Sequence, residues 1–212
     1  MITLDALDLS ALLCSRVCHD VISPVGAIVN GLEIIADSKD AETQEFALDM
    51  IRKSAENASS KLKFARLAFG ASGSAGALID SGDAEAAAKS MFADEKAKLG
   101  WSAPRALVPK NRIKLLLNLV VLAATAIPRG GSLDVTVEGD DPEHQSFTLV
   151  ARGINARIPP HAAELLAGEP ASGSIDAHVI QPFYAGMLAR ECGMAVAISI
   201  EGDTVTVRAA DA

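Results

Sequence analysis

Apolar and small side chains recur at alternating steps of three and four residues along two long segments near the start of the chain. The first stripe is Cys14, Val17, Val21, Pro24, Ile28, Gly31 and Ile35, and the second is Leu48, Ile51, Ala55, Ala58, Leu62, Ala65 and Phe69. This heptad rhythm is typical of helices that bury one stripe against neighbours at shallow crossing angles. The polar residues 37–40 between the segments predict a turn, so the two helices are expected to form an antiparallel hairpin.

A two-helix hairpin cannot enclose a core alone, and the many small residues in its stripes favour close approach by a second copy of the chain. We therefore expect a homodimer whose hairpins form a four-helix bundle. Pro24 lies inside the first helix, where it removes one backbone hydrogen bond and should bend the helix.

Residues 70–76 contain only glycine, alanine and serine, which predicts a domain boundary. Beyond it, helical patterns cover residues 83–99, 113–127 and 177–192. Short or alternating apolar runs predict strands at 105–108, 132–137, 146–151, 196–200 and 204–208. The expected fold class is α+β, with a helical hairpin domain at residues 1–70 and an α/β sandwich domain at residues 77–212.

The chain has a formal net charge of −8 and a pI near 5.0. This charge argues against nucleic acid as the main partner, because phosphate backbones are bound by clustered Lys and Arg. No apolar run reaches the ~18–20 residues that a membrane span needs, the longest being residues 113–127, and no signal sequence is evident. We expect a cytoplasmic protein. Its cysteines, Cys14, Cys18 and Cys192, show no disulfide framework or zinc spacing, so no metal is expected.

His19 lies opposite the stripe of the first helix. At about 100° per residue, a set of mostly apolar residues falls roughly 140–240° away from it around the helix: Val17, Val21, Pro24, Val25, Ile28, Leu32 and Ile35. Apart from Leu12, the residues on its own face are small or polar: Ser15, Arg16, Ser23, Gly26 and Asn30. A histidine in the middle of a helix is often only a surface residue, but this face would let another protein approach the ring closely.

An imidazole suits a transferable phosphoryl group, because one nitrogen can attack while the other is held by a hydrogen bond. Asp20 could orient or deprotonate the ring, although a solvated carboxylate is the simpler interpretation. If the hairpin turns near residue 39, Lys61 and Lys63 lie close to His19 and form a basic strip that could bind phosphate or an acidic partner. A solvated helix face is the alternative for these lysines.

The string from His19 to Pro24, His-Asp-Val-Ile-Ser-Pro, resembles the H-box of sensor histidine kinases. In that family the H-box lies on the first helix of a dimerisation and phosphotransfer hairpin, and a nucleotide-binding domain follows. The heptad hairpin and the following α/β domain extend this resemblance over nearly the whole chain.

The second domain departs from the kinase pattern at its nucleotide-contact positions. Residues 118–123 resemble the N-box, but Leu122 replaces its second Asn and Thr125 stands where a basic residue is usual. Residues 151–155, Ala-Arg-Gly-Ile-Asn, occupy the place of Asp-x-Gly-x-Gly, and residues 174–176, Ser-Ile-Asp, replace the Gly-Leu-Gly of the lid. Since base recognition and phosphate binding depend on these groups, no usable ATP site is expected.

An intact H-box beside a degenerate ATPase-like domain resembles the histidine phosphotransferases of bacterial phosphorelays. The resemblance implies that His19 is the phosphoryl acceptor, with the receiver domain of a hybrid kinase as donor and response-regulator receivers as acceptors. It implies no cofactor on this chain and Mg²⁺ on the partner receiver. The residues expected to contact the receiver are Arg16, Ser23, Asn30, Lys61 and Lys63.

Two alternatives remain open from the sequence. The first is a non-catalytic dimeric docking module in which His19 is incidental, and the second is a kinase with an unconventional ATP site. The other histidines, His144, His161 and His178, are weaker candidates for the acceptor, because none has an Asp-x-x-x-Pro context.

Overall fold

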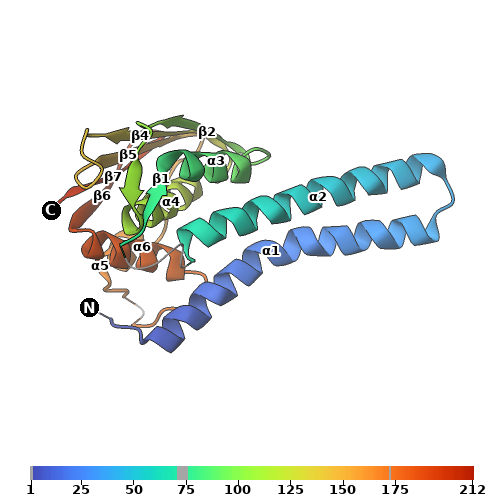
Figure 1. Cartoon of the computed structure of the whole chain (residues 1–212). Helices are drawn as coiled ribbons and strands as arrows, with labels where there is room; N and C mark the ends of the chain where they lie inside the picture. Colours follow the sequence, from blue (N-terminus) through green and yellow to red (C-terminus); the bar gives the residue numbers. More distant parts are fainter. Residues whose placement is uncertain (1, 71–75, 172) are drawn as a thin grey trace.

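A helical hairpin projects from a mixed α/β domain in the computed structural model, which describes residues 2–70, 76–171 and 173–212 (Figure 1). The predicted α+β class and the order of hairpin and sandwich are confirmed. The predicted boundary at residues 70–76 lies mostly outside the described residues, so the division into residues 1–70 and 77–212 stays a prediction.

The hairpin consists of α1 (Ala6–Asp37) and α2 (Ala41–Ala68). An aspartate caps each helix: Asp5 accepts a hydrogen bond from the backbone N–H of Asp8 at 2.8 Å, and Asp40 accepts one from Thr43 at 2.9 Å. These bonds satisfy N–H groups that have no partner within the helix. Helix α1 continues through Pro24, and Figure 1 shows it bending between its two halves.

The stripe predicted for α1 packs inside the hairpin, except that Cys14 is exposed. Gly31 marks the closest approach, because a Cβ there would lie 2.6 Å from a side-chain carbon of Ile51. The stripe predicted for α2 is wrong in part. Ala47, Ala58 and Ala68 are buried, whereas the predicted Leu48, Ala55 and Leu62 are exposed. Helix α2 carries two apolar stripes side by side, and the prediction mixed residues of both.

The second domain contains a five-stranded sheet in the order β2-β4-β5-β7-β6. Strand β2 pairs parallel with β4, and the other neighbours are antiparallel. The strands are β2 (Ala97–Ser102), β4 (Gly131–Glu138), β5 (Ser146–Arg152), β6 (Met194–Glu201) and β7 (Thr204–Asp211).

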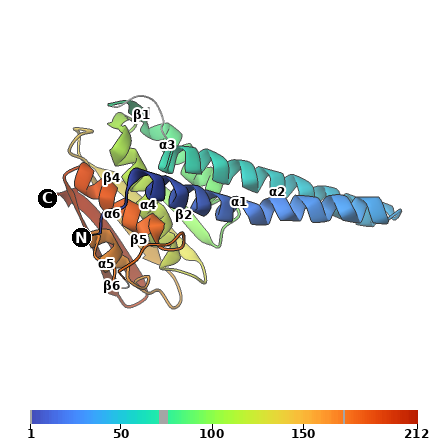
Figure 2. The same ribbon diagram turned by 90° about the horizontal axis from the view of Figure 1, so that it is seen from below.

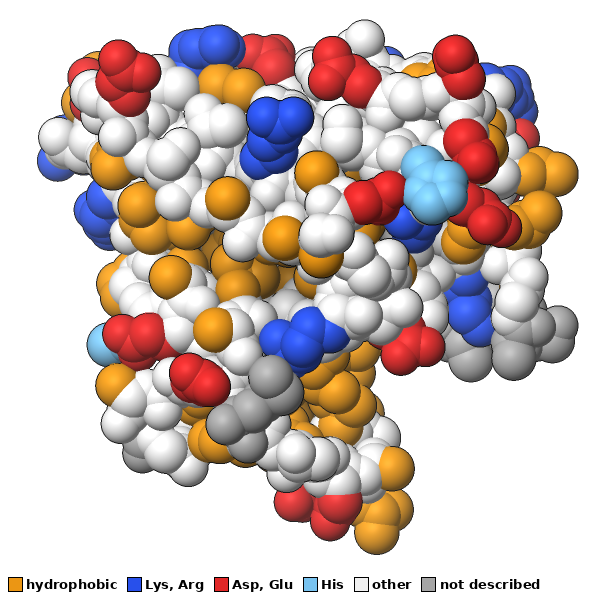
Figure 3. All heavy atoms as spheres, turned by 90° about the vertical axis from the view of Figure 1, so that its left-hand side faces the viewer, with side chains coloured by type: hydrophobic (Ala, Val, Ile, Leu, Met, Phe, Trp, Pro, Cys, Tyr) orange, Lys and Arg blue, Asp and Glu red, His pale blue; other side chains and the backbone are white. Residues whose placement is uncertain are grey.

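Helices α4 (Lys110–Thr125), α5 (Ala162–Ala167) and α6 (Ile180–Glu191) lie on one face of this sheet (Figure 2). Leu133, Leu149 and Val207 of the sheet are fully buried against Leu119 and Ala185 of the helices. At the β6 edge, α5 and α6 leave an apolar groove of about 470 Å³, and Figure 3 shows apolar side chains gathered in a hollow on this side of the molecule.

The predicted helix at residues 83–99 is too long. Helix α3 (Ser81–Met91) ends early, and residues from Ala97 onward form β2 instead. After the helix, every second residue is apolar: Ala97, Leu99 and Trp101 pack against the hydrophobic clusters of the domain. A strand places such alternate residues on one face.

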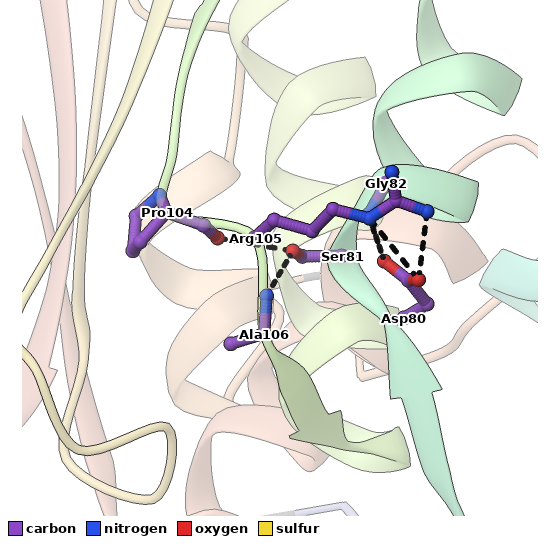
Figure 4. A network of polar contacts seen from close by, with 6 residues as sticks. All are labelled: Asp80, Ser81, Gly82, Pro104, Arg105 and Ala106. Atoms are coloured by element: carbon purple, nitrogen blue, oxygen red, sulfur yellow. Dashed lines mark hydrogen bonds and ion pairs between the residues drawn. The ribbon is translucent and has the colours of Figure 1, made fainter.

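A short two-stranded sheet, β1 (Leu78–Asp80) with β3 (Leu107–Pro109), leads into α3. Figure 4 shows the hydrogen bonds that hold the segment before β3 against the start of α3. The Ser81 hydroxyl donates to the Pro104 carbonyl at 3.0 Å and accepts from the Ala106 N–H at 2.9 Å. The Arg105 guanidinium lies 3.0 Å from the Asp80 carboxylate and holds the pKa of that carboxyl below its ordinary value.

The last predicted helix, residues 177–192, begins later than expected. One oxygen of Asp176 accepts hydrogen bonds from the backbone N–H groups of His178 (2.8 Å) and Val179 (3.2 Å), and α6 starts only at Ile180. This carboxylate fixes the segment before α6 as a turn.

Helix α1 is long and apolar enough, by length and composition, to cross a membrane. Its best 18-residue window has a mean hydropathy of 1.4, and only 6% of that window is buried within the chain. No membrane span was predicted there from the sequence, because polar residues, including the pairs Ser15-Arg16 and His19-Asp20, interrupt its apolar positions.

The hairpin is anchored on the second domain at its open end. Figures 1 and 2 both place the start of α1 beside α6, and Leu9 and Leu13 pack against the main core there. On α2, Phe64 and Ala68 are buried in a cluster with Ile113 and Leu117 of α4. The H-box half of the hairpin therefore lies against the second domain, while the turn at residues 38–40 points away from it.

Candidate phosphoryl-acceptor site

His19 lies in the middle of α1, and its side chain is 67% exposed. The predicted outward orientation is confirmed by this exposure. A neighbouring protein can therefore reach the imidazole without any rearrangement of the helix.

Asp20 lies between His19 and Arg16. One Asp20 oxygen is 3.7 Å from Nδ1 of His19, which is longer than a hydrogen bond, and the other accepts a hydrogen bond from Nε of Arg16 at 3.0 Å. Arg16 thus fixes the carboxylate beside one ring nitrogen. Because Asp20 is on the Nδ1 side, the Nε2 side of the ring remains for attack on a phosphoryl group.

Below this pair, the hairpin meets the second domain in a narrow crevice. The crevice is lined by Arg16 and Asp20 of α1, Lys61 and Phe64 of α2, and Gln181 of α6. The Arg16 and Asp20 side chains are 24% and 30% exposed, so both are partly shielded from water. Their positions depend on the second domain as well as on α1.

The structure separates the residues predicted to contact a receiver. Ser23 and Lys61 line a groove of about 530 Å³, and Ser23 lies four residues, about 6 Å along the helix, from His19. Lys63 lines a different hollow, beside Ser60 and Ser90 of α2 and α3. Asn30 is exposed but lies eleven residues along α1 from His19, which is about 16 Å. The Arg16 side chain forms an ion pair with Asp20.

His178 is a neighbour of His19 that the sequence reading ranked as a weak candidate. Its ring centroid lies 5.7 Å from that of His19, and the two planes are at 79°, an edge-on arrangement. His178 belongs to the segment before α6, where kinases have their nucleotide lid. In the sequence, only this position before the last helix could have pointed to His178, because nothing near it resembles an H-box.

At the degenerate nucleotide positions, the side chains bind other parts of the protein. Asn118 is fully buried, and its amide nitrogen donates to the carbonyls of Ala68 (3.1 Å) and Lys114 (2.9 Å). Gln181 in turn donates to the Asn118 backbone carbonyl at 2.5 Å. Leu122 and Ala151 are buried in the main core. Asn118, the residue at the first N-box position, therefore joins α4 to the end of α2.

Among the described residues, no three His, Cys, Asp or Glu side chains lie close enough together to hold a metal ion. Cys14 and Cys18 are exposed on α1. Burial raises the pKa of the Cys192 thiol to about 11.

Comparisons with known proteins agree with this architecture. The family model described as "Histidine phosphotransferase C-terminal domain" matches residues 81–204. The protein phosphotransferase ChpT of Brucella abortus (strain 2308) is 48% identical over 208 residues, which cover 98% of each chain. A solved bacterial phosphotransferase is 46% identical, with a TM-score of 0.90 and 98% coverage of each chain.

A remote match is the histidine kinase AdeS of Acinetobacter baumannii, which is 13% identical with a TM-score of 0.45 over 90% of this chain and 95% of that one. The family model matches more than half of the chain, and a relative with nearly half its residues identical spans almost all of it. The chain therefore belongs to the histidine phosphotransferase family.

Proposed function

We propose that this protein carries a phosphoryl group on His19 between the receiver domain of a hybrid kinase and the receiver domains of response regulators. The observation that carries the proposal is an exposed H-box histidine whose Nδ1 side faces a carboxylate held by Arg16. Family membership supports phosphotransfer as the activity.

In the accepting step, the Nε2 lone pair of neutral His19 attacks the phosphorus of an aspartyl phosphate on the donor receiver. The N–P bond forms as the acyl phosphate P–O bond breaks, and the aspartate leaves as a carboxylate. Asp20 stabilises the positive charge that develops on the ring, because it lies next to Nδ1. The reverse sequence delivers the phosphoryl group to an aspartate of the next receiver, whose bound Mg²⁺ neutralises charge on the phosphoryl oxygens.

ATP has no part in this cycle. An N-box Asn must reach the ligand, but the Asn118 amide is enclosed between α2, α4 and α6. The carboxylate that would recognise adenine is replaced by Ala151, whose side chain belongs to the core. Neither residue can contact a nucleotide without a rearrangement of the domain.

The active form is a homodimer with a four-helix bundle. Helix α1 has only two fully buried residues, and a second apolar stripe runs beside its internal seam. The stripe residues Ile22, Val25, Val29 and Leu32 are 42–68% exposed, and Leu48 and Leu62 of α2 are 57% and 50% exposed. Pairing with a second hairpin would bury both stripes, as in other four-helix bundles.

A covered stripe also accounts for the apolar character of α1 without a membrane, and we place the protein in the cytoplasm with its receiver partners. The net charge of −8 likewise disfavours nucleic acid as a partner.

The test is labelling with radioactive phosphate from two sources. The wild type and the His19→Ala variant are each incubated with a phosphorylated receiver or with labelled ATP, and His161→Ala serves as the control. We expect acid-labile label only from the receiver, in the wild type and the control but not in His19→Ala. Label from ATP would indicate a kinase, and no label from either source would indicate a docking module.

A further inference from the structure

His178 lies beside His19 but belongs to the second domain, not to the hairpin. The edge-on contact between the rings, at 5.7 Å between centroids, leaves His19 67% exposed, so it does not block a partner. His178 itself is exposed. The two imidazoles therefore lie side by side at the surface, so a phosphoryl group carried by His19 would be formed close to the His178 ring.

The backbone on both sides of His178 is held in place. Ile175, three residues before His178, and Val179, directly after it, pack against the same buried cluster as Leu12 of α1. Between them, Asp176 accepts hydrogen bonds from the N–H groups of His178 and Val179. The segment is therefore anchored to the helix that carries His19, and the position of the His178 ring follows from these contacts.

We propose that His178 is a second catalytic residue, whose ring N–H donates a hydrogen bond to an oxygen of the phosphoryl group on His19. This inference rests on the proposed function of His19. In phosphoryl transfer, negative charge spreads over the three non-bridging oxygens in the transition state. A donor already fixed beside those oxygens stabilises that charge without reorganisation.

The charged groups around the pair fit this role. Asp20 and Arg16 lie on the side of His19 that faces the crevice, and they bind each other. Asp176 is engaged with backbone N–H groups. Among the described residues, none of these three side chains forms a hydrogen bond or ion pair with the His178 ring, so the ring N–H is available to a phosphoryl oxygen.

Three substitutions at His178 distinguish hydrogen bonding from packing. His178→Gln keeps an N–H donor, His178→Phe keeps a ring without a donor, and His178→Ala keeps neither. His161→Ala, another exposed histidine of the same domain, is the control. For each variant, the first-order rate of transfer from phosphorylated protein to saturating acceptor receiver is measured, together with receiver affinity.

We expect the Phe and Ala variants to transfer about tenfold more slowly, while the Gln variant stays within about threefold of wild type and receiver affinity is unchanged. A wild-type rate in the Phe variant, or a Gln variant as slow as Ala, would overturn the proposal. Failure of the wild type to accept phosphate from any receiver, or label remaining in His19→Ala, would instead overturn the proposed function itself.

Discussion

At the scale of single residues, a short chain of side chains surrounds His19 on its Nδ1 side. Arg16 binds Asp20, and Asp20 lies beside one nitrogen of His19. Contact of Arg16 with a receiver stays a prediction, and its ion pair with Asp20 leads us to infer that it also positions that carboxylate.

We predict that Asp20→Asn slows phosphoryl acceptance by about tenfold, because the amide cannot stabilise the developing charge on the imidazole as a carboxylate does. Arg16→Gln should slow it less, since Asp20 remains but loses its anchor. Transfer rates from a phosphorylated receiver provide the measurement, with Glu33→Gln, farther along α1, as the control. Unchanged rates in both variants would mean that Asp20 is only a solvated carboxylate.

The H-box made His19 and Asp20 predictable from the sequence, since six consecutive residues carry that pattern. The His178 contact could not be predicted in the same way. It arises only when the segment before α6 and the start of α1 pack against the same buried cluster. A contact between distant segments leaves no local pattern.

At the scale of elements, α1 has an internal seam and an exposed apolar stripe beside it. Val29 lies in the exposed stripe at 48% exposure, and the adjacent Asn30 lies on the polar face. We predict that Val29→Asp dissociates the dimer while Asn30→Asp leaves it intact, because only the first places a charge inside the bundle interface. Light scattering after gel filtration gives the mass of each. A Val29→Asp dimer as stable as wild type would place the interface elsewhere.

Helix α2 presents its two lysines to different surroundings, although the sequence grouped them as one basic strip. Lys61 shares the crevice with Asp20 and the groove with Ser23, whereas Lys63 faces the hollow beside α3. We therefore predict that Lys61→Glu weakens receiver binding about tenfold and Lys63→Glu weakens it less. Titrations at low and high salt should show the difference shrinking as salt rises. Equal effects of the two changes would restore the idea of a single strip.

The regular elements were largely predictable, because each has its own period of apolar residues. The errors occurred where one segment carries two overlapping periods. In α2, Leu48, Ala55 and Leu62 belong to an outer stripe, yet they fit the same heptad as Ala58. After α3, the change from helical to strand period at Ala97 lies inside an alanine- and lysine-rich run that favours helix locally.

At the scale of the whole molecule, the second domain has a sheet covered by helices, and a residue that resembles the first N-box position contacts the hairpin. Asn118 holds the last carbonyl of α2, and Gln181 supports Asn118 from α6. The same domain supplies His178 and one wall of the crevice under Asp20. These contacts fix the hairpin, and His19 with it, against the second domain and His178.

The coupling through Asn118 can be tested by Asn118→Ala. This change leaves the Ala68 carbonyl without its buried donor, so we expect the free energy of unfolding to fall by about 1–3 kcal/mol. It should also loosen the end of α2, with faster amide exchange near Ala68 and slower phosphoryl transfer, because the hairpin no longer keeps a fixed position against His178. Asn111→Ala, at a partly exposed position of the same helix, is the matched control and should change neither quantity. Denaturation, hydrogen exchange and transfer assays on both variants provide the measurements. If Asn118→Ala unfolded like the control and transferred at the wild-type rate, the domain would hold the hairpin by its apolar contacts alone.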